Sequence, residues 1–167
     1  MLIDWISLQR RNTIATLQTA AQAHKTPEQV AELLCSEDFL VSIEKQREEV
    51  VDAVYRLIEK TDDITVFEIA VTGYKHNKKG DMDTSGTTTN VAEYRWERSK
   101  QLLSFHYKGS GRIIISGTYH LQPEATGTRL SFEATIEVKI PVFGRIIASR
   151  IKKEMQRSFG TVVSKIG

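Results

Sequence analysis

The chain lacks most of the features that identify a specialised compartment or a polyanionic partner. Its 167 residues include a single cysteine, Cys35, and the net charge is only +2. One cysteine excludes an internal disulfide and favours a reducing compartment. A charge this small does not indicate a nucleic-acid partner, so we expect none.

Long hydrophobic runs are absent as well. No segment reaches the roughly 18 consecutive apolar residues that a membrane-spanning helix needs. The first twelve residues, MLIDWISLQRRN, differ from a secretory signal because Asp4 interrupts a short apolar part and the basic residues follow it. We therefore expect a cytoplasmic protein.

Sequence motifs for catalysis, cofactors and metals are also missing. The four histidines form no HExxH or HxH pattern and no cysteine pair accompanies them, so we expect no metal site. There is no P-loop, no GxGxxG and no GxSxG nucleophile elbow. From the residues alone we assign no cofactor and no catalytic residue.

What the chain does have is a clear pattern near its C-terminus. From Thr128 to Ile140 apolar and polar residues alternate strictly, which predicts a long strand with one buried face. Pro141, which has no N–H to donate, ends this ladder. The apolar residues then recur at helical spacing, which predicts a long amphipathic C-terminal helix with this stripe: Phe143, Ile147, Ile151, Met155, Phe159, Val162 and Ile166.

The preceding sequence predicts mostly strands. Thr26–Pro27 and Ser36 each provide the start of a short helix. Strands are expected over 13–24, 50–62, 64–74, 90–100, 102–109 and 113–123. Short connections between the later strands indicate antiparallel neighbours. Residues 74–90 are polar and aperiodic, which predicts a loop that would suit a gate. Residues 1–12 would form a separate N-terminal arm.

This order of elements resembles the helix-grip fold of the START-like (SRPBCC) superfamily. The resemblance covers residues 13–167 and is most specific where GTRLSFEATIEVKIP leads through Phe143–Gly144 into the last helix. It implies an α+β fold, in which a curved antiparallel sheet of about seven strands, with two short helices after the first, wraps a long C-terminal helix. It also implies one domain with a cavity for an apolar ligand, and a likeness to uncharacterised bacterial families.

Four tyrosines fall on the apolar faces of their predicted strands, namely Tyr55, Tyr94, Tyr107 and Tyr119. Each would bring a hydroxyl toward the interior, as in a pocket with a few polar anchors in an apolar lining. Plain core packing is the alternative for each of them. The expected ligand-binding residues are Phe67, Ile69, Tyr94, Trp96, Phe105, Tyr119, Phe132, Ile136, Ile151, Met155 and Phe159.

Two functions stay open at this point. The first is binding or transport of a hydrophobic small molecule, such as a lipid, an isoprenoid or an aromatic metabolite. The second is an enzyme of the polyketide aromatase/cyclase or hydrolase kind, which would use the cavity tyrosines. The last helix is strongly basic, so peripheral contact with anionic membranes is a further expectation alongside a plain solvated face. That contact would use Arg145, Arg150, Lys152, Lys153 and Arg157.

Overall fold

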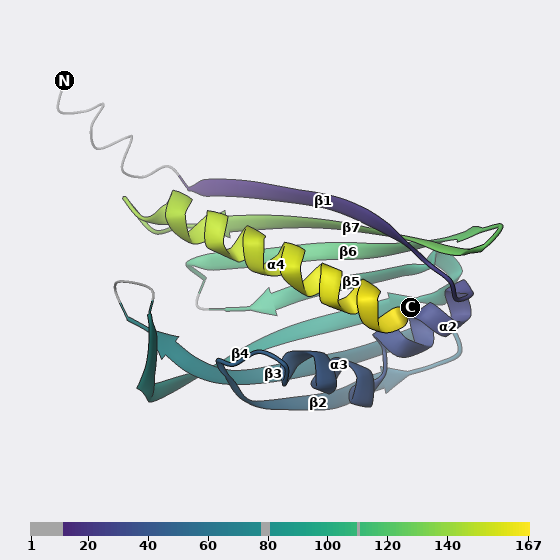
Figure 1. The fold of residues 1–167 in the computed structure, drawn as a ribbon, viewed down its shortest axis with the longest axis horizontal. Helices are drawn as coiled ribbons and strands as arrows, with labels where there is room; N and C mark the ends of the chain where they lie inside the picture. The colour runs from purple at the N-terminus through teal and green to yellow at the C-terminus, as the bar shows by residue number, and fades with distance from the viewer. Residues whose placement is uncertain (1–11, 78–80, 110) are drawn as a thin grey trace, which may run out of the picture.

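The computed structural model describes residues 12–77, 81–109 and 111–167, and the predicted N-terminal arm lies almost entirely outside them. Seven strands form one antiparallel sheet in the order β1-β7-β6-β5-β4-β3-β2 (Figure 1). The strands are β1 Thr13–Ala23, β2 Val50–Lys60, β3 Ile64–His76, β4 Met82–Glu97, β5 Leu102–Lys108, β6 Ile113–Glu124 and β7 Gly127–Val138. The order follows the chain except that β1 pairs with the last strand, which leaves β1 and β2 at the two edges.

Two short helices, α2 (Pro27–Leu34) and α3 (Glu37–Glu44), connect β1 to β2. Thr26 caps α2 with a capping box, in which its hydroxyl accepts from Gln29 N and its own N–H donates to Gln29 Oε1. The Ser36 hydroxyl accepts from Phe39 N at the start of α3. Both predicted helix starts are confirmed.

β7 shows the predicted alternation as far as Val138, two residues before the predicted end at Ile140. Leu130, Phe132, Ala134, Ile136 and Val138 are all buried, whereas the residues between them are exposed or half-buried. β1 pairs with β7 from Thr13↔Val138 to Ala23↔Thr128 without a register shift. Register shifts occur only in the pairs β2–β3 and β3–β4 among the described residues.

The loop predicted over residues 74–90 is wrong. β3 extends to His76 and β4 begins at Met82, so most of this segment belongs to a long β-hairpin. Tyr74 pairs with Thr87, and an irregularity follows at Lys75. The hairpin reaches past the core, so both of its faces are polar and the alternation of apolar and polar residues disappears. Its many threonines, which favour strands, were the remaining signal in the sequence. A gate made of loop backbone therefore loses its basis.

The C-terminal helix α4 (Gly144–Ile166) packs on β1 and β7, along one side of the concave face (Figure 1). Its first residue, Gly144, is buried against β1. The two approach so closely that a Cβ on Gly144 would lie 2.7 Å from Thr13 Oγ1. Its end is tied back to β1 by the bond from His24 N to Gly167 O, 3.0 Å long.

One residue of the predicted helix stripe is misplaced. Phe143 takes the N-cap position of α4 and is 58% exposed, so it is not part of the buried stripe. The close approach of Gly144 to β1 sets where the helix starts, and the side chain before it points away from the sheet. Val142, which precedes it, has φ +68°, an uncommon conformation for a β-branched residue.

Candidate ligand groove

A continuous row of aromatic rings crosses the concave face of the sheet. It runs from Tyr55 on β2 through Phe67 and Tyr94 to Phe105 on β5, with centroids 5.0, 5.0 and 5.8 Å apart. From Phe105 it branches to Tyr119 on β6 and Phe132 on β7, and both contact Phe159 of α4. Antiparallel register places these inward residues side by side, and each such ring pair contributes about 0.5–1.5 kcal/mol beyond burial of its area.

The helix covers only part of this aromatic floor. α4 packs on β1 and β7, and inward residues of β3 to β6 stay half-buried, including Val71, Tyr94, Phe105 and Tyr119. Met155 of α4 is half-buried as well and contacts both hydrophobic clusters of the molecule. The uncovered stretch is therefore a groove, with the sheet as its floor and α4 as one wall.

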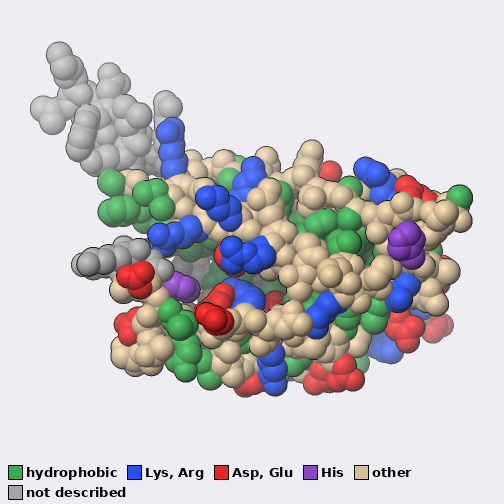
Figure 2. Space-filling model, in the orientation of Figure 1, with side chains coloured by type: hydrophobic (Ala, Val, Ile, Leu, Met, Phe, Trp, Pro, Cys, Tyr) green, Lys and Arg blue, Asp and Glu red, His purple; other side chains and the backbone are tan. Residues whose placement is uncertain are grey.

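A hollow of about 370 Å³ lies between α4 and the connection from α3 to β2, at the edge of this groove. Ile43 at its bottom belongs to the same hydrophobic cluster as Tyr94, Tyr119 and Phe159. Figure 2 shows the molecule hollowed on this face, with hydrophobic side chains inside and charged side chains around the rim. The volume falls at the small end of the range for ligand pockets. The residues lining the hollow are Ile43, Gln46, Arg47, Glu48, Glu49, Glu154, Arg157, Ser158 and Thr161.

Ion pairs organise the rim of the hollow. Arg47 contacts Glu44 Oε2 at 3.2 Å and Glu49 Oε1 at 2.7 Å, while Arg157 contacts Glu154 across one helical turn at 3.0 Å. Burial opposes the charge of Arg47, but the hydrogen bonds and charges of Glu49 and Glu44 outweigh it and raise its pKa. Burial likewise opposes ionisation of Glu49, yet hydrogen bonds from its own backbone and from Arg47 lower its pKa. Arg47 and Glu49 are therefore both charged at neutral pH.

The four inward tyrosines differ in how their hydroxyls are satisfied. The Tyr55 hydroxyl donates to Cys35 O at 3.0 Å, and the Tyr107 hydroxyl donates to Asn90 Oδ1 at 2.7 Å. Within the described part of the chain, the hydroxyls of Tyr94 and Tyr119 have no hydrogen-bond partner, and neither is sealed from water-sized space. The fold itself therefore uses neither of these two hydroxyls as a hydrogen-bonding group.

The electrostatic surroundings keep both tyrosines protonated. Burial raises the pKa of Tyr94 and of Tyr119 well above the ordinary value, and the negative charge of Glu44 raises both further. Tyr119 also contributes to the upward shift in the pKa of Tyr94. At neutral pH each hydroxyl is a hydrogen-bond donor and not a base.

The predicted ligand-binding residues all lie on the concave side. Tyr94, Phe105, Tyr119, Ile151 and Met155 are half-buried, so they border open space. Ile136 lies apart from the aromatic floor, in a second cluster with Val138 and Ala148 beneath the first half of α4. The remaining predicted residues are buried in the main cluster: Phe67, Ile69, Trp96, Phe132 and Phe159.

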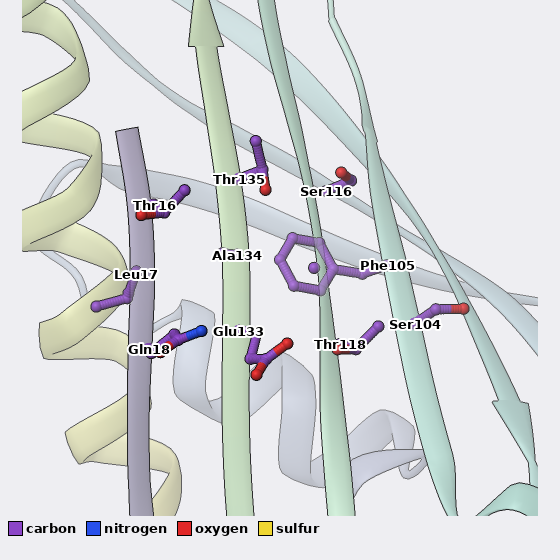
Figure 3. Close-up of a pocket in the computed structure, with 11 residues that line it drawn as sticks. Thr16, Leu17, Gln18, Ser104, Phe105, Ser116, Thr118, Glu133, Ala134 and Thr135 are labelled. Atoms are coloured by element: carbon purple, nitrogen blue, oxygen red, sulfur yellow. The ribbon is translucent and has the colours of Figure 1, made fainter. Parts of the chain in front are cut away.

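A second hollow, of about 400 Å³, lies on the outer face of the sheet (Figure 3). Short polar side chains of four neighbouring strands surround it, including Thr16, Ser116, Thr118 and Thr135. Phe105 and its register partner Gly117 also border it, and the Phe105 ring packs so closely over Gly117 that a Cβ there would lie 2.6 Å from the ring. It is bordered by the outward-facing side chains of these strands and not by α4, so we do not assign the ligand to it.

The groups with the most familiar catalytic chemistry lie elsewhere. His106 and His120 are exposed on the outer face, as predicted. Burial raises the pKa of the Cys35 thiol to about 12, which makes it a poor nucleophile. Among the described residues, no group of histidine, cysteine and carboxylate side chains is arranged to hold a metal ion.

Sequence reasoning missed Glu44 and Arg47. They follow the last core residue of α3, Ile43, where a charged pair looks like an ordinary exposed helix end. Only the return of β2 beside α3 and the approach of α4 place them next to the aromatic floor.

Solved structures with the same fold are numerous but distant in sequence. TTHA0849 from Thermus thermophilus matches with a TM-score of 0.60 and 18% identity, covering 91% of this chain and 94% of that one. Ara h 8.0201 matches with a TM-score of 0.60 and 11% identity, covering 92% and 98%. Norcoclaurine synthase from Thalictrum flavum, in complex with dopamine and hydroxybenzaldehyde, matches with a TM-score of 0.61 and 10% identity, covering 96% and 90%.

These likenesses confirm the predicted fold. The seven-stranded curved sheet with a long C-terminal helix is the helix-grip fold of START-like proteins. None of the described helices has both the length and the apolar character needed to cross a membrane. No curated protein matches the sequence. A family model matches residues 18–162, so the chain belongs to the family described as "Protein of unknown function (DUF2505)".

Proposed function

We propose that the protein binds a hydrophobic small molecule, a lipid, an isoprenoid or an aromatic metabolite, in the groove between the sheet and α4. The observation that carries this proposal is the half-buried aromatic floor, where Tyr94 and Tyr119 leave their hydroxyls without a partner among the described residues. An ordinary core would bury such rings completely and satisfy their hydroxyls. Binding of small aromatic molecules by norcoclaurine synthase, which has the same fold, supports the proposal.

The walls and floor would come from the predicted ligand-binding residues. Phe105, Tyr119 and Met155 would contact the ligand directly, because they are half-buried and border the groove. The fully buried members would support them from below. Ile136 would act only through Ile151 and Met155, which pack against its cluster.

A blocking substitution tests the proposal. Ala92 and Val91 are neighbours on β4 whose side chains point to opposite faces, Ala92 toward the groove. Ala92→Trp should fill the groove and weaken binding of a neutral apolar probe, N-phenyl-1-naphthylamine. Val91→Trp should bind this probe as the wild-type protein does, as measured by fluorescence titration. Equal binding by both variants, or no binding by the wild-type protein and no compound released on organic extraction, would contradict the proposal.

Binding is favoured over catalysis by the state of the candidate groups. An aromatase/cyclase-type reaction would need a base or nucleophile in the groove, and the raised pKa values of Tyr94 and Tyr119 leave them as donors. The histidines are exposed, two of them on the outer face, and Cys35 stays protonated. Glu44 is the group whose replacement would test the enzymatic alternative, through turnover of any compound that co-purifies.

We also propose that α4 lets the protein approach anionic membranes, as its basic residues suggest. Besides Arg145, Arg150, Lys152, Lys153 and Arg157, the start of α4 exposes the large apolar side chains of Val142, Phe143 and Ile146. Exposed apolar residues flanked by cations are typical of peripheral membrane contact. A cytoplasmic location would suit this role.

Vesicle binding tests the membrane proposal. Phe143→Ser and Lys152→Glu/Lys153→Glu should each weaken sedimentation with phosphatidylserine vesicles, and salt should weaken it for the wild-type protein. Equal binding to neutral phosphatidylcholine vesicles at every salt concentration would exclude the electrostatic part.

A further inference from the structure

The polar groups at one end of the groove allow the ligand class to be narrowed, an inference that rests on the proposed function. Tyr94 and Tyr119 belong to the aromatic floor, so an apolar ligand lying on that floor would reach their hydroxyls. Both hydroxyls are accessible, and neither has a partner within the described residues. They therefore present two unused donors to the ligand.

The charge around the neighbouring hollow is negative overall. Arg47 is one of two arginines that line the hollow, but it already bonds Glu44 through Nη1 and Glu49 through Nε and Nη2. Arg157 is likewise engaged by Glu154. The hollow and its ion pairs thus bring together four carboxylates, those of Glu44, Glu48, Glu49 and Glu154, against two guanidinium groups.

Glu44 connects this charge to the tyrosines. It is the last residue of α3 and follows Ile43, which is buried in the cluster that Tyr94 and Tyr119 pack against. Its carboxylate is close enough to influence both tyrosines electrostatically. A carboxylate is an acceptor without a proton to give, whereas the tyrosines are donors.

We infer that the groove binds a ligand with an apolar body and a neutral hydroxyl group, a phenol or an alcohol, held by Tyr94, Tyr119 and Glu44. A hydroxyl accepts from a tyrosine and donates to Glu44 at once, so it satisfies both kinds of group. A hydrocarbon would leave the two tyrosine hydroxyls without a partner. A carboxylate would meet the negative charge of Glu44 while both rim guanidinium groups are already paired.

Three probes with the same ring system test this inference at pH 7 on the full-length protein: 2-naphthol, naphthalene and 2-naphthoate. Fluorescence or calorimetric titration should show 2-naphthol binding about tenfold or more tightly than naphthalene, as expected for hydrogen bonds that include a charged acceptor. 2-Naphthoate should bind most weakly. Tyr94→Phe and Tyr119→Phe should each weaken the affinity for 2-naphthol by about threefold to tenfold and leave the affinity for naphthalene unchanged.

Two further variants separate binding roles from structural ones. Glu44→Gln should weaken binding of 2-naphthol and strengthen binding of 2-naphthoate, because it removes the negative charge of the side chain and keeps its shape. Tyr55→Phe is the matched control, since Tyr55 lies in the same aromatic row but its hydroxyl already bonds Cys35 O. It should not change the preference among the probes.

The outcomes also distinguish this inference from the proposed function. Naphthalene binding as tightly as 2-naphthol, or 2-naphthoate binding most tightly, would overturn the hydroxyl assignment while supporting an apolar groove. Tighter binding of 1-naphthylmethylammonium than of 2-naphthol would overturn it in favour of a cation. Failure of the three neutral and anionic probes and of N-phenyl-1-naphthylamine to bind would overturn the proposed function itself.

Discussion

β6 and β7 are hydrogen-bonded neighbours with the same inward alternation, yet their inner faces have different surroundings. On β7, Phe132, Ala134 and Ile136 are buried, whereas their partners on β6, Tyr119, Gly117 and Ile115, are only half-buried. The two strands differ in what lies above them, because α4 packs on β7 and β1. The same pattern of residues thus produces core on one strand and groove floor on the next.

Inward-facing and buried are therefore different properties of a residue in this fold. Apolar side chains left half-covered forgo part of the hydrophobic stabilisation that full burial provides, about 25 cal/mol per Å². The aromatic rings of β3 to β6 retain contacts with one another, which keeps the uncovered floor ordered.

The largest expected effect is on stability at paired isoleucines. Ile136 on β7 and Ile115 on β6 face each other across the ladder. Ile136→Ala should lower the free energy of unfolding by about 2–5 kcal/mol, because its side chain is completely buried. Ile115→Ala should cost clearly less, since part of its surface already meets water. Urea unfolding measures both, and equal losses would mean that β6 is as well covered as β7.

A charge in the wall of the groove should reduce ligand binding more than it reduces stability. Met155→Asp places an unpaired carboxylate beside the apolar floor, so it should lower the free energy of unfolding by about 1–3 kcal/mol. It should also weaken binding of N-phenyl-1-naphthylamine more than about tenfold. Gln156→Asp adds the same charge at the next, exposed position and serves as the control. Wild-type melting and binding for Met155→Asp would show that this face of α4 does not border the groove.

Alkaline pH should destabilise the protein through the two groove tyrosines. Their pKa is raised in the folded state, so the folded protein holds these protons when the unfolded chain has begun to lose them. Stability is therefore unaffected below about pH 10 and falls as pH rises further, by up to about 1.4 kcal/mol per tyrosine at about pH 11.

Replacing each of these two tyrosines by phenylalanine tests whether they cause the loss of stability at alkaline pH. Between about pH 8 and about pH 11, Tyr94→Phe and Tyr119→Phe should each lose less stability in urea unfolding than the wild-type protein loses. A wild-type stability that does not change over this interval would contradict the raised pKa values.

The smallest expected effect concerns two glycines of α4. Gly160 has open space around its Cα, so Gly160→Ala should raise stability by about 0.5–1 kcal/mol through helix propensity. Gly144→Ala should instead lower it, because the new methyl group would approach Thr13 Oγ1 at 2.7 Å. Thermal melts of both variants would show whether the first turn of α4 is held against β1 as closely as the structure has it.

Much of the fold was predictable because it depends on local patterns. The strict alternation over Thr128–Ile140 and the caps at Thr26 and Ser36 are signals contained within a few residues, and all three are confirmed. The hairpin at residues 74–90 was missed because its polar faces carry no period, even though its backbone is paired. Phe143 was assigned to the wrong face because spacing alone does not show where a helix begins.

For the site, the inward-facing residues were predictable, since alternation along a strand assigns each side chain to one face. The alternation thereby identified the aromatic floor with three of the four predicted tyrosines, Tyr55, Tyr94 and Tyr119. Only the tertiary structure decided which of these are covered, which hydroxyls lack a partner among the described residues, and that Glu44 and Arg47 lie at the rim. Those properties depend on where α3 and α4 pack on the sheet, and contacts between elements distant in the chain leave no periodic trace in it.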